Sequence, residues 1–588
     1  MLLELERPLG AAAVLAVPLA VGAALRHSAG LAGSAPAQAL AVAGGLLALL
    51  LAWLWRPTPP LDASNRVVPG PCRGLPCIGA TLEVIGAWET ILDWMLLHQR
   101  RAGWGTTWGF TTLRMGGFAG GVAVLATPQA VEHVLKTNFE KYEKGAAFRA
   151  VLGDFLGAGI FASDGPAWRF HRKVAVQMFS KRLLQEGTAT ALANCTALVR
   201  RLDAAAVSGE PVELQAVFFA FTMDTFAELA FGVQLNSQDQ THRFATAFDT
   251  AQRLCNERFR LPWFGLLRAL QASAAERRIT AEVAIMRSFA LELVRARRAE
   301  LRAGSGGEKA DLISRFLGAE GKWAELRGGG GGGGGGGDGG GGFTDEELAD
   351  MVLNFIIAGR DTTACALSWG TLRLLRAPAA AAAARAELDA AVGGGSSGAA
   401  GLHELPPDDV FELVQRKLPY LKAVMSETLR LHPSVPKDGK YAVAADTLPD
   451  GTTVRKGCFM LWSNYCLGRD PTIWGPDSET FRPERWLQNG GGGGGGDAGR
   501  AGAAGAGSLW RPTTQVSDFQ YPVFNGGPRL CLGRPLAYLE MQLVLGAVLS
   551  RYELAEAPGC AHTDEYTNSI VAPMKKGLTV TVKRRRSA

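Results

Sequence analysis

The chain has 588 residues, enough for several domains, and a formal net charge of +6, which is small for this length. No nucleic-acid-binding motif accompanies this charge, so the sequence predicts no nucleic-acid partner. The nine cysteines are an odd number without paired spacing around the motifs described below, which favours a reducing compartment over a disulfide framework.

The amino-terminal part of the chain is apolar. Residues 37–55 form an uninterrupted run of apolar and small residues that ends before Arg56, and about 20 such residues span a bilayer. An earlier run, 9–25, is broken by Pro18 and either spans the membrane or lies at its interface. We therefore expect residues 1–56 to be a membrane anchor with one or two spanning segments.

The anchor is followed by a proline-rich stretch, residues 57–71, which we predict to be a stiff hinge. Glu4 and Glu6 argue against a plastid or mitochondrial transit peptide, because such peptides are poor in acidic residues. The sequence therefore favours the endoplasmic reticulum membrane over a plastid membrane. If only the second apolar run spans the bilayer, Arg56 lies on the cytosolic side.

Three glycine-rich tracts account for much of the remaining length. They cannot bury enough apolar surface to offset their conformational entropy, so we expect flexible surface loops. Their bounds are 328–342, 393–401 and 490–508. The rest of residues 72–588 suffices for one large domain, and the tracts interrupt none of its motifs.

Residues 344–376 are predicted to form one long helix. Thr344 and Glu347 have the spacing of a capping box at its start, and Pro378 follows its end. Its centre reads AGRDTT, which is unusual because glycine and consecutive threonines weaken a helix. A long helix that is weakened at its centre indicates either a functional site or a crossing point between packed helices.

Two sets of residues have helical spacing. In a regular helix Ala358, Asp361 and Thr362 are expected to share one face, because they are three and four residues apart. Glu427 and Arg430 of the sequence ETLR are also three apart. Apolar residues flank this pair, so we expect it to be buried and to need further polar partners, although an exposed ion pair has the same spacing.

The most specific pattern is FNGGPRLCLG, residues 524–533. It places Cys531 in a glycine-rich turn just before a predicted helix that extends to Tyr552. Backbone N–H groups and the helix dipole at that position are expected to lower the thiol pKa and to favour a thiolate metal ligand. A buried core cysteine is the alternative.

Together these motifs resemble those of the cytochrome P450 family of haem-thiolate monooxygenases, and they follow the family's order between residues 168 and 533. The residues that match its haem-binding loop are Phe524, Gly527, Arg529, Cys531 and Gly533. The resemblance implies a mainly α fold with small β-sheets (α+β), arranged as a triangular helical haem domain. It also implies haem b as cofactor, with Cys531 as the axial ligand of the iron.

The resemblance assigns roles to residues outside the loop. Thr362 and Asp361 would be catalytic, in oxygen activation and proton delivery, with Gly359 leaving room for dioxygen. The ETLR pair would form a structural triad with Arg485 of the sequence FRPERW. Further residues expected at the haem, the cationic ones as partners of its propionates, are Trp168, Arg172, Ala358, Gly359, Lys440 and Arg529.

A monooxygenase of this family inserts one oxygen atom of O2 into a C–H bond of a lipophilic substrate. The resemblance implies electrons from NADPH-cytochrome P450 reductase, with or without cytochrome b5, at the cytosolic face of the membrane. Segments 155–165, 311–317 and 448–452, together with Arg360, resemble the plant clan that ω-hydroxylates fatty acids, so a fatty acid is the leading substrate. A sterol, a carotenoid or another isoprenoid is the alternative.

Two other classes of function remain open at this point. The acid and threonine of AGRDTT disfavour a hydroperoxide isomerase or dehydratase, because such family members lose these residues. A non-enzymatic haem protein would leave AGRDTT unexplained. By analogy, the positions that line the substrate pocket are Phe148, Val151, Phe155, residues 259–267, Val435 and residues 570–574.

Two surfaces are also expected. Four apolar residues are predicted either to dip into the membrane or to belong to the core: Leu261, Trp263, Phe264 and Leu266. A basic tail, residues 583–586, suggests with Arg529 and Arg534 a positive surface that would suit an acidic reductase.

Overall fold

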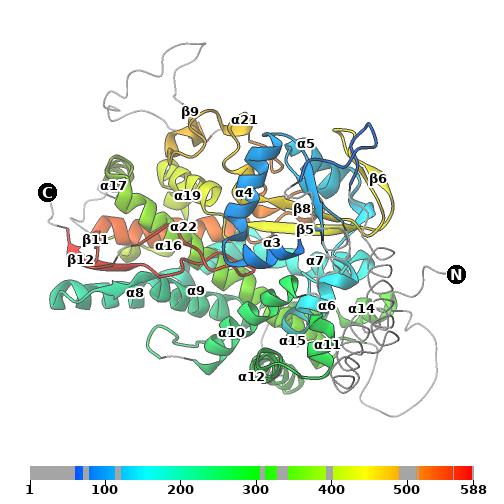
Figure 1. Ribbon diagram of the computed structural model, residues 1–588. Helices are drawn as coiled ribbons and strands as arrows, with labels where there is room; N and C mark the ends of the chain where they lie inside the picture. Colours follow the sequence, from blue (N-terminus) through cyan, green and yellow to red (C-terminus); the bar gives the residue numbers. More distant parts are fainter. Residues whose placement is uncertain are drawn as a thin grey trace, which may run out of the picture. The chain divides into compact units, whose positions relative to one another are not determined.

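The computed structural model describes residues 60–70, 79–112, 121–240, 242–261, 263–304, 311–327, 342–392, 401–488, 511–512, 516–560 and 562–585 (Figure 1). Its contacts divide the chain into two compact units. Unit 1 consists of Met1–Phe155, Phe248–Ala284 and Asp438–Ser463, and unit 2 consists of Leu156–Ala247, Ile285–Lys437 and Asn464–Ala588.

A five-stranded sheet with the strand order β1-β2-β8-β5-β3 is the framework of unit 1. Its strands are β1 (Trp108–Thr111), β2 (Gly121–Leu125), β3 (Tyr142–Glu143), β5 (Lys437–Ala442) and β8 (Phe459–Ser463). Strands β2 and β8 are parallel, and every residue in both is buried, as expected for central strands covered on both faces. A separate hairpin pairs β6 (Asp446–Thr447) with β7 (Thr453–Val454).

The helices that lie within unit 1 are short. They are α3 (Thr81–Gly86), η2 (Trp88–Thr90), α4 (Ile91–Ala102), α5 (Pro128–Glu132), η3 (His133–Thr137), η4 (Phe139–Lys141), η6 (Arg258–Arg260) and α11 (Phe264–Ala269). Three helices have residues in both units: α6 (Gly145–Leu156), α10 (Arg243–Glu257) and α12 (Ala274–Arg302).

A buried carboxylate ties the β6–β7 hairpin to the preceding part of unit 1. Asp446 accepts hydrogen bonds of 2.8–2.9 Å from His133, Asn138, Lys141 and Tyr142. Burial acts to raise the pKa of Asp446, but these four hydrogen bonds outweigh it and hold the pKa below its ordinary value. The carboxylate therefore stabilises this region in its charged form.

The apolar residues around α11 were predicted either to dip into the membrane or to belong to the core, and they differ in exposure. Phe264 is 8% exposed and belongs to the core, whereas Trp263 and Leu266 are 42% and 43% exposed. Membrane contact of the exposed pair stays a prediction. Val151 and Phe155, which were expected to line a pocket, are buried in the core of unit 1.

The predicted hinge is in large part a fixed element of unit 1. The backbone N–H of Leu61 donates to the carbonyl of Thr453 at 3.1 Å, that of Gly109 donates to the carbonyl of Pro69 at 2.8 Å, and Val68 is 3% exposed. The prediction of a hinge is therefore wrong for residues 60–70, because backbone hydrogen bonds hold them to β1 and β7. The predicted anchor, residues 1–56, lies outside the described residues.

Unit 2 is mainly helical. Its helices are α7 (Gly165–Ala175), η5 (Val176–Phe179), α8 (Lys181–Ser208), α9 (Leu214–Phe231), α13 (Leu312–Gly318), α14 (Glu320–Leu326), α15 (Asp345–Ile356), η7 (Ile357–Asp361), α16 (Thr362–Arg376), α17 (Pro378–Val392), η8 (Leu402–Glu404), α18 (Pro407–Arg416), α19 (Pro419–Leu431), α20 (Asn464–Leu467), α21 (Pro471–Trp474), η9 (Pro483–Trp486), η10 (Pro522–Phe524), η11 (Gly527–Arg529) and α22 (Arg534–Arg551). The predicted class, mainly α with small β-sheets, is confirmed.

Two small sheets complete unit 2. One has the order β11-β12-β4 and the other pairs β9 with β10. Their strands are β4 (Val212–Glu213), β9 (Leu487–Gln488), β10 (Arg511–Pro512), β11 (Tyr552–Glu556) and β12 (Thr579–Arg584).

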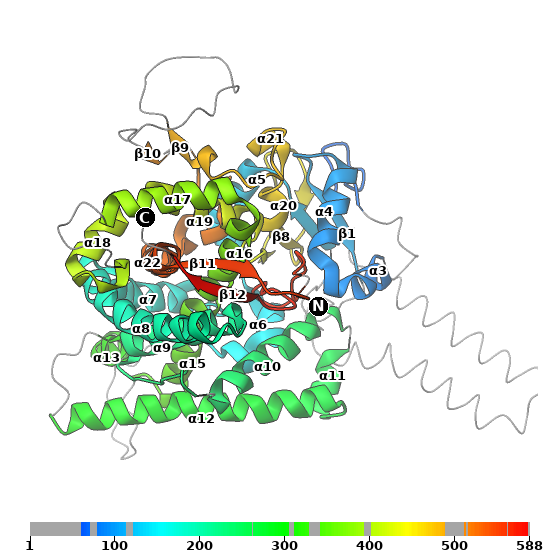
Figure 2. The ribbon, with the colours of Figure 1, turned by 90° about the vertical axis from the view of Figure 1, so that its left-hand side faces the viewer.

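Helix α16 is the centre of unit 2, where it contacts α9, α17, α19 and α22. Helices α8 and α9 pack side by side (Figure 2). Of the described helices, α9 alone is long and apolar enough to cross a membrane, but 67% of its apolar window is buried inside the protein. Its contacts with α8 and α16 identify it as a core helix.

Two arginines of the basic tail pair with carboxylates of unit 2. Arg584 pairs with Asp203 at 3.0 Å, and Arg585 pairs with Asp389 at 2.9 Å. Asp203 also pairs with Arg551, so it is shared between two arginines, and a positive docking surface at the tail stays a prediction.

Candidate active site

The predicted long helix is continuous from Asp345 to Arg376, with a π-helical turn, η7, between α15 and α16. The capping box is confirmed, because Thr344 and Glu347 exchange both of its hydrogen bonds, at 3.0 and 3.1 Å. The sequence AGRDTT contributes most of the π turn. Such turns are wider than a regular helical turn and are frequent at functional sites.

The π turn changes which side chains are accessible. Within residues 348–372, three residues keep accessible surface: Ala358, Gly359 and Thr362. Asp361 is 1% exposed and pairs with the neighbouring Arg360 at 2.9 Å. The prediction that Asp361 shares one face with Ala358 and Thr362 is therefore wrong, because a π turn interrupts the 3.6-residue period.

Three contacts hold the accessible residues in place. The hydroxyl of Thr362 donates to the carbonyl of Ala358 at 2.7 Å, and the hydroxyl of Ser434 donates to the carbonyl of Thr362 at 2.6 Å. A Cβ atom on Gly359 would lie 2.0 Å from the ring of Phe226 in α9. Phe226 is therefore one physical reason for glycine at this position, and room for dioxygen stays a prediction.

The loop before α22 is shaped by two backbone hydrogen bonds. Leu530 donates to the carbonyl of Gly527 at 3.1 Å, and Cys531 donates to the carbonyl of Phe524 at 2.8 Å. Gly527 has a φ of +59°, a conformation that favours glycine. Helix α22 begins at Arg534, so Cys531 lies just before its first turn, as predicted.

The thiol of Cys531 has solvent-accessible surface, although protein atoms crowd it. This desolvation raises the pKa of the thiol and outweighs the N–H groups of Gly533 and Arg534 and the charge of Arg172, which lower it. The N–H groups at the helix start therefore act on the pKa in the predicted direction, and burial outweighs them. The helix start does supply the expected donors, and a metal cation bound to the sulfur would reverse the balance, because coordination requires the thiolate.

Two arginines flank Trp168 beside this loop. The guanidinium carbons of Arg172 and Arg529 lie 5.9 and 4.5 Å from the centroid of the Trp168 ring. Arg172 donates to the carbonyl of Leu530 at 2.7 Å, and Arg529 pairs with Asp164 at 3.0 Å. Two cations next to an accessible thiol match the chemistry of a haem, whose propionates are anionic and whose iron takes a sulfur ligand.

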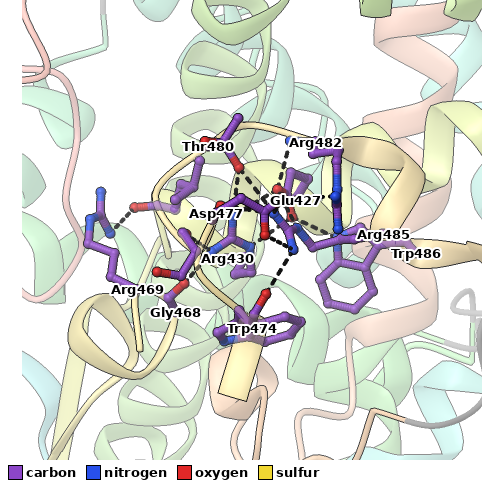
Figure 3. A network of polar contacts seen from close by, with 12 residues as sticks. Glu427, Arg430, Gly468, Arg469, Trp474, Asp477, Thr480, Arg482, Arg485 and Trp486 are labelled. Carbon is purple, nitrogen blue, oxygen red and sulfur yellow. Dashed lines mark hydrogen bonds and ion pairs between the residues drawn. The ribbon is translucent and has the colours of Figure 1, made fainter. Parts of the chain in front are cut away.

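The expected triad is present (Figure 3). Glu427 and Arg430 are 0% exposed, and the side chain of Arg485 is 6% exposed. Glu427 accepts two hydrogen bonds of 2.8 Å from Arg430 and one of 2.9 Å from Arg485. It also accepts from the backbone N–H of Arg482 at 2.8 Å and from the indole of Trp486 at 2.9 Å. The second arginine of the triad thus comes from η9, the segment that contains FRPERW.

The inner arginine of the triad joins two further segments. Arg430 donates to the carbonyls of Gly468, Ser478 and Thr480, the last at 3.0 Å (Figure 3). Its guanidinium carbon also lies 5.3 Å from the centroid of the Trp474 ring. None of these contacts is with Cys531. The network therefore acts as a structural clamp between α19 and the chain that follows it.

Lys440, expected as a propionate partner, is a fully buried residue of β5 in unit 1. Its Nζ lies 4.0 Å from the centroid of the Phe139 ring. This cation–π contact is one stabilising contact of the buried ammonium group, and a role at the haem stays a prediction.

Sequence reasoning missed several contributors. Ser434 and Phe226 touch the π turn from segments far away in the chain, and no local pattern marks either residue. Trp486 directly follows Arg485 in FRPERW, so that motif contained the signal for a further partner of Glu427.

Glu540 of α22 offers a test of the packing between α22 and α16. It is 2% exposed, its Oε1 has no hydrogen-bond partner among the described residues, and burial raises its pKa to about 8. An acid whose pKa is raised on folding contributes its stability below its unfolded value of about 4.5 and loses it as pH rises to about 8. Glu540→Gln is therefore expected to raise the thermal midpoint by a few degrees at pH 8 and to change it little at pH 4.5. A gain of the same size at both pH values would contradict this account.

Comparison with known proteins agrees with this geometry. The sequence model of the family Cytochrome P450 matches residues 69–581. The chain is 34% identical over 477 residues to Cytochrome P450 CYP94D109 of Paris polyphylla, covering 78% of this chain and 84% of that protein. It is 32% identical over 531 residues to Cytochrome P450 monooxygenase cyp1 of Mycosarcoma maydis, covering 86% and 74%.

A solved structure shows the same fold. The crystal structure of the cytochrome P450DA heme domain superposes with a TM-score of 0.65 and 20% sequence identity, covering 85% of this chain and 94% of that chain.

A helical fold with an accessible cysteine before α22 and cations beside it defines a haem-thiolate protein. The chain belongs to the cytochrome P450 family. It is therefore a monooxygenase that binds haem through a cysteine thiolate and that uses O2, a small-molecule substrate and a redox partner.

Proposed function

We propose that Cys531 is the axial ligand of the haem iron and that Arg172, Arg529 and Trp168 bind the propionates. The support is the position of the thiol before α22, where the N–H groups of Gly533 and Arg534 approach the sulfur. When bound, the haem supplies the oxygen chemistry, because thiolate donation favours O–O cleavage. Phe524 and Gly527 shape the loop through their backbone carbonyls.

In the proposed site, the residues in the π turn and directly after it bind and orient the substrate. Ala358 and Gly359 present a small, accessible surface, and Thr362 offers a hydroxyl whose own proton is directed to the carbonyl of Ala358 at 2.7 Å. The Thr362 oxygen therefore accepts a hydrogen bond from a substrate, water or oxygen species without rotating. Asp361 supports this position by its ion pair with Arg360, and proton delivery through it requires that this pair opens.

Thr362→Ala is expected to keep the haem and the fold, because the side chain is only partly buried and its hydroxyl bonds locally. Product formation per NADPH consumed is expected to fall by about 10-fold or more, with the oxygen released as peroxide. Parallel measurement of NADPH, peroxide and product checks this result. Thr362→Ser is the matched control, because it retains the hydroxyl, and equal coupling in both variants would contradict the role of Thr362.

We further propose that the substrate is a fatty acid and that the product is an (ω-)hydroxy acid. The proposal is supported by similarity to proteins of the 94 series of the family, such as Cytochrome P450 94C1 of Arabidopsis thaliana, at 34% identity over 478 residues. It is also supported by the apolar character of the accessible positions Val435 and Ile570. Incubation with fatty acids, sterols and carotenoids, followed by mass spectrometry, tests the proposal, and turnover of an isoprenoid alone would refute it.

For the partners, we propose NADPH-cytochrome P450 reductase, with or without cytochrome b5, at the cytosolic face of the endoplasmic reticulum membrane. The docking surface differs from the one first expected, because Arg529 is 9% exposed and paired with Asp164. Arg534 is the accessible cation beside the loop, at 40% exposed, although it pairs with Asp518 at 2.9 Å. Reconstitution of NADPH-dependent turnover with purified reductase tests this assignment.

A further inference from the structure

Two segments that are far apart in the sequence lie side by side next to the π turn. Ala572 donates a backbone hydrogen bond to the carbonyl of Ser434 at 3.0 Å, and Lys437 donates from Nζ to the side-chain oxygen of Asn568 at 2.9 Å. Ser434 is also bonded to the carbonyl of Thr362. The start of β5 and the turn 568–572 are therefore both fixed close to the residue proposed to act in oxygen activation.

The side chains of these segments differ in accessibility. Val435, Lys437 and Ile570 keep accessible surface, as Thr362 does, whereas Pro436, Ser569 and Val571 are buried. Asp438 is also accessible, but it pairs with Lys144 and, as the next residue of β5, points to the face opposite Lys437. The accessible set is thus apolar except for one cation and one hydroxyl. A substrate that reaches Thr362 along these residues meets a mainly apolar surface with a single positive group.

The ammonium group of Lys437 has fewer partners than its chemistry allows. Among the described residues it has one hydrogen-bond acceptor, Asn568, and no carboxylate within ion-pair distance. A lysine ammonium carries three N–H groups, so two remain for another acceptor. Desolvation alone lowers the pKa of Lys437 to about 8. A desolvated cation without a counter-ion is costly, and a bound anion would offset that cost.

A second polar group beside Asn568 is also unsatisfied. Ser569 is 5% exposed, and its hydroxyl has no hydrogen-bond partner among the described residues. Lys440, in contrast, lies on the opposite face of β5, because residues three apart in a strand point to opposite sides. The unsatisfied groups at the turn 568–572 are therefore distinct from the buried cation–π contact of Lys440.

We propose that Lys437 binds the carboxylate of the substrate, with Asn568 orienting its ammonium group and Ser569 as a second donor. This inference rests on the proposed fatty-acid substrate. A carboxylate matches the site because it carries one negative charge and only accepts hydrogen bonds, whereas a phosphate dianion would require more than one cation. Lys437 thereby makes the enzyme select free acids over esters and over neutral lipids.

The test compares dodecanoic acid with its methyl ester, by spectral titration and by product analysis on the haem-loaded enzyme. The wild type is expected to bind the acid about 10- to 100-fold more tightly than the ester, as for a hydrogen-bonded charge pair. Lys437→Met, which keeps the length of the side chain, is expected to abolish this ratio with little change for the ester. Lys437→Arg retains the charge and is expected to keep most of the preference for the acid.

Lys576→Met is the matched control, because Lys576 follows the same turn but is 55% exposed. It is expected to keep the full preference for the acid. An unchanged ratio of acid to ester affinity in Lys437→Met would overturn the inference. Equal binding of acid and ester by the wild type would also overturn it, and this comparison needs no variant. Loss of haem from Lys437→Met would also overturn it, by placing the lysine at a propionate instead. Failure of the wild type to oxidise any fatty acid, with turnover of another lipid, would instead refute the proposed function.

Discussion

Cys531→Ser is expected to lower monooxygenase turnover by more than about 100-fold. Even outer residues around a metal ligand change activity by about 10- to 100-fold, so loss of the ligand itself costs more. A serine hydroxyl in the loop before α22 is a poor ligand for haem iron, and it cannot donate electron density as a thiolate does. The measurement is turnover together with the absorbance of the reduced carbon monoxide complex, which is expected to lose its thiolate band.

A second cysteine provides the control for this experiment. Cys560 is also a free cysteine with accessible surface, but it lies after β11, outside the proposed site. Cys560→Ser is expected to keep the thiolate band and at least half of the turnover. A thiolate band that persists in Cys531→Ser would assign the iron to another residue and would contradict the proposed site.

Local patterns in the sequence were sufficient for the parts of the site that depend on short segments. The capping box of Thr344, the helix start after Cys531 and the burial of Glu427 all follow from residues within a few positions of one another. Arg485 required the family resemblance, because its partner is 58 residues away in the chain.

The parts that the sequence could not provide depend on contacts between distant segments. Asp361 lies in the π turn at AGRDTT and forms a buried ion pair instead of lying on an accessible face. A prediction that assumes the period of a regular helix cannot detect a π turn. The ring of Phe226 in α9 leaves no space for a Cβ atom at Gly359. Lys437 donates a hydrogen bond to Asn568, which is 131 residues away in the chain. The thiol pKa likewise depends on the balance between desolvation and local donors, which needs the packed structure.

Glu427→Ala is expected to prevent accumulation of the folded holoprotein. The carboxylate is 0% exposed and is the shared acceptor of Arg430, Arg485 and Trp486 (Figure 3). Its removal leaves the buried guanidinium of Arg430 without its counter-ion and leaves Arg485 with Asp477 alone, at 3.3 Å. Breaking a buried ion pair in this way costs about 3–5 kcal/mol. Because whole domains are stable by only about 5–15 kcal/mol, one such loss removes a large part of the total.

The matched control is an ion pair of the same kind on the surface of unit 2. Glu412 and Arg416 of α18 are 3.1 Å apart, with side chains 49% and 74% exposed, so solvent screens their attraction. Glu412→Ala is expected to change stability by less than about 0.5 kcal/mol. The measurement is the soluble yield and the thermal midpoint of each variant, together with haem content. Because Glu427 contacts none of the residues proposed at the haem, a stable Glu427→Ala protein that has lost only its haem would show that the network acts on the cofactor site, not on the fold.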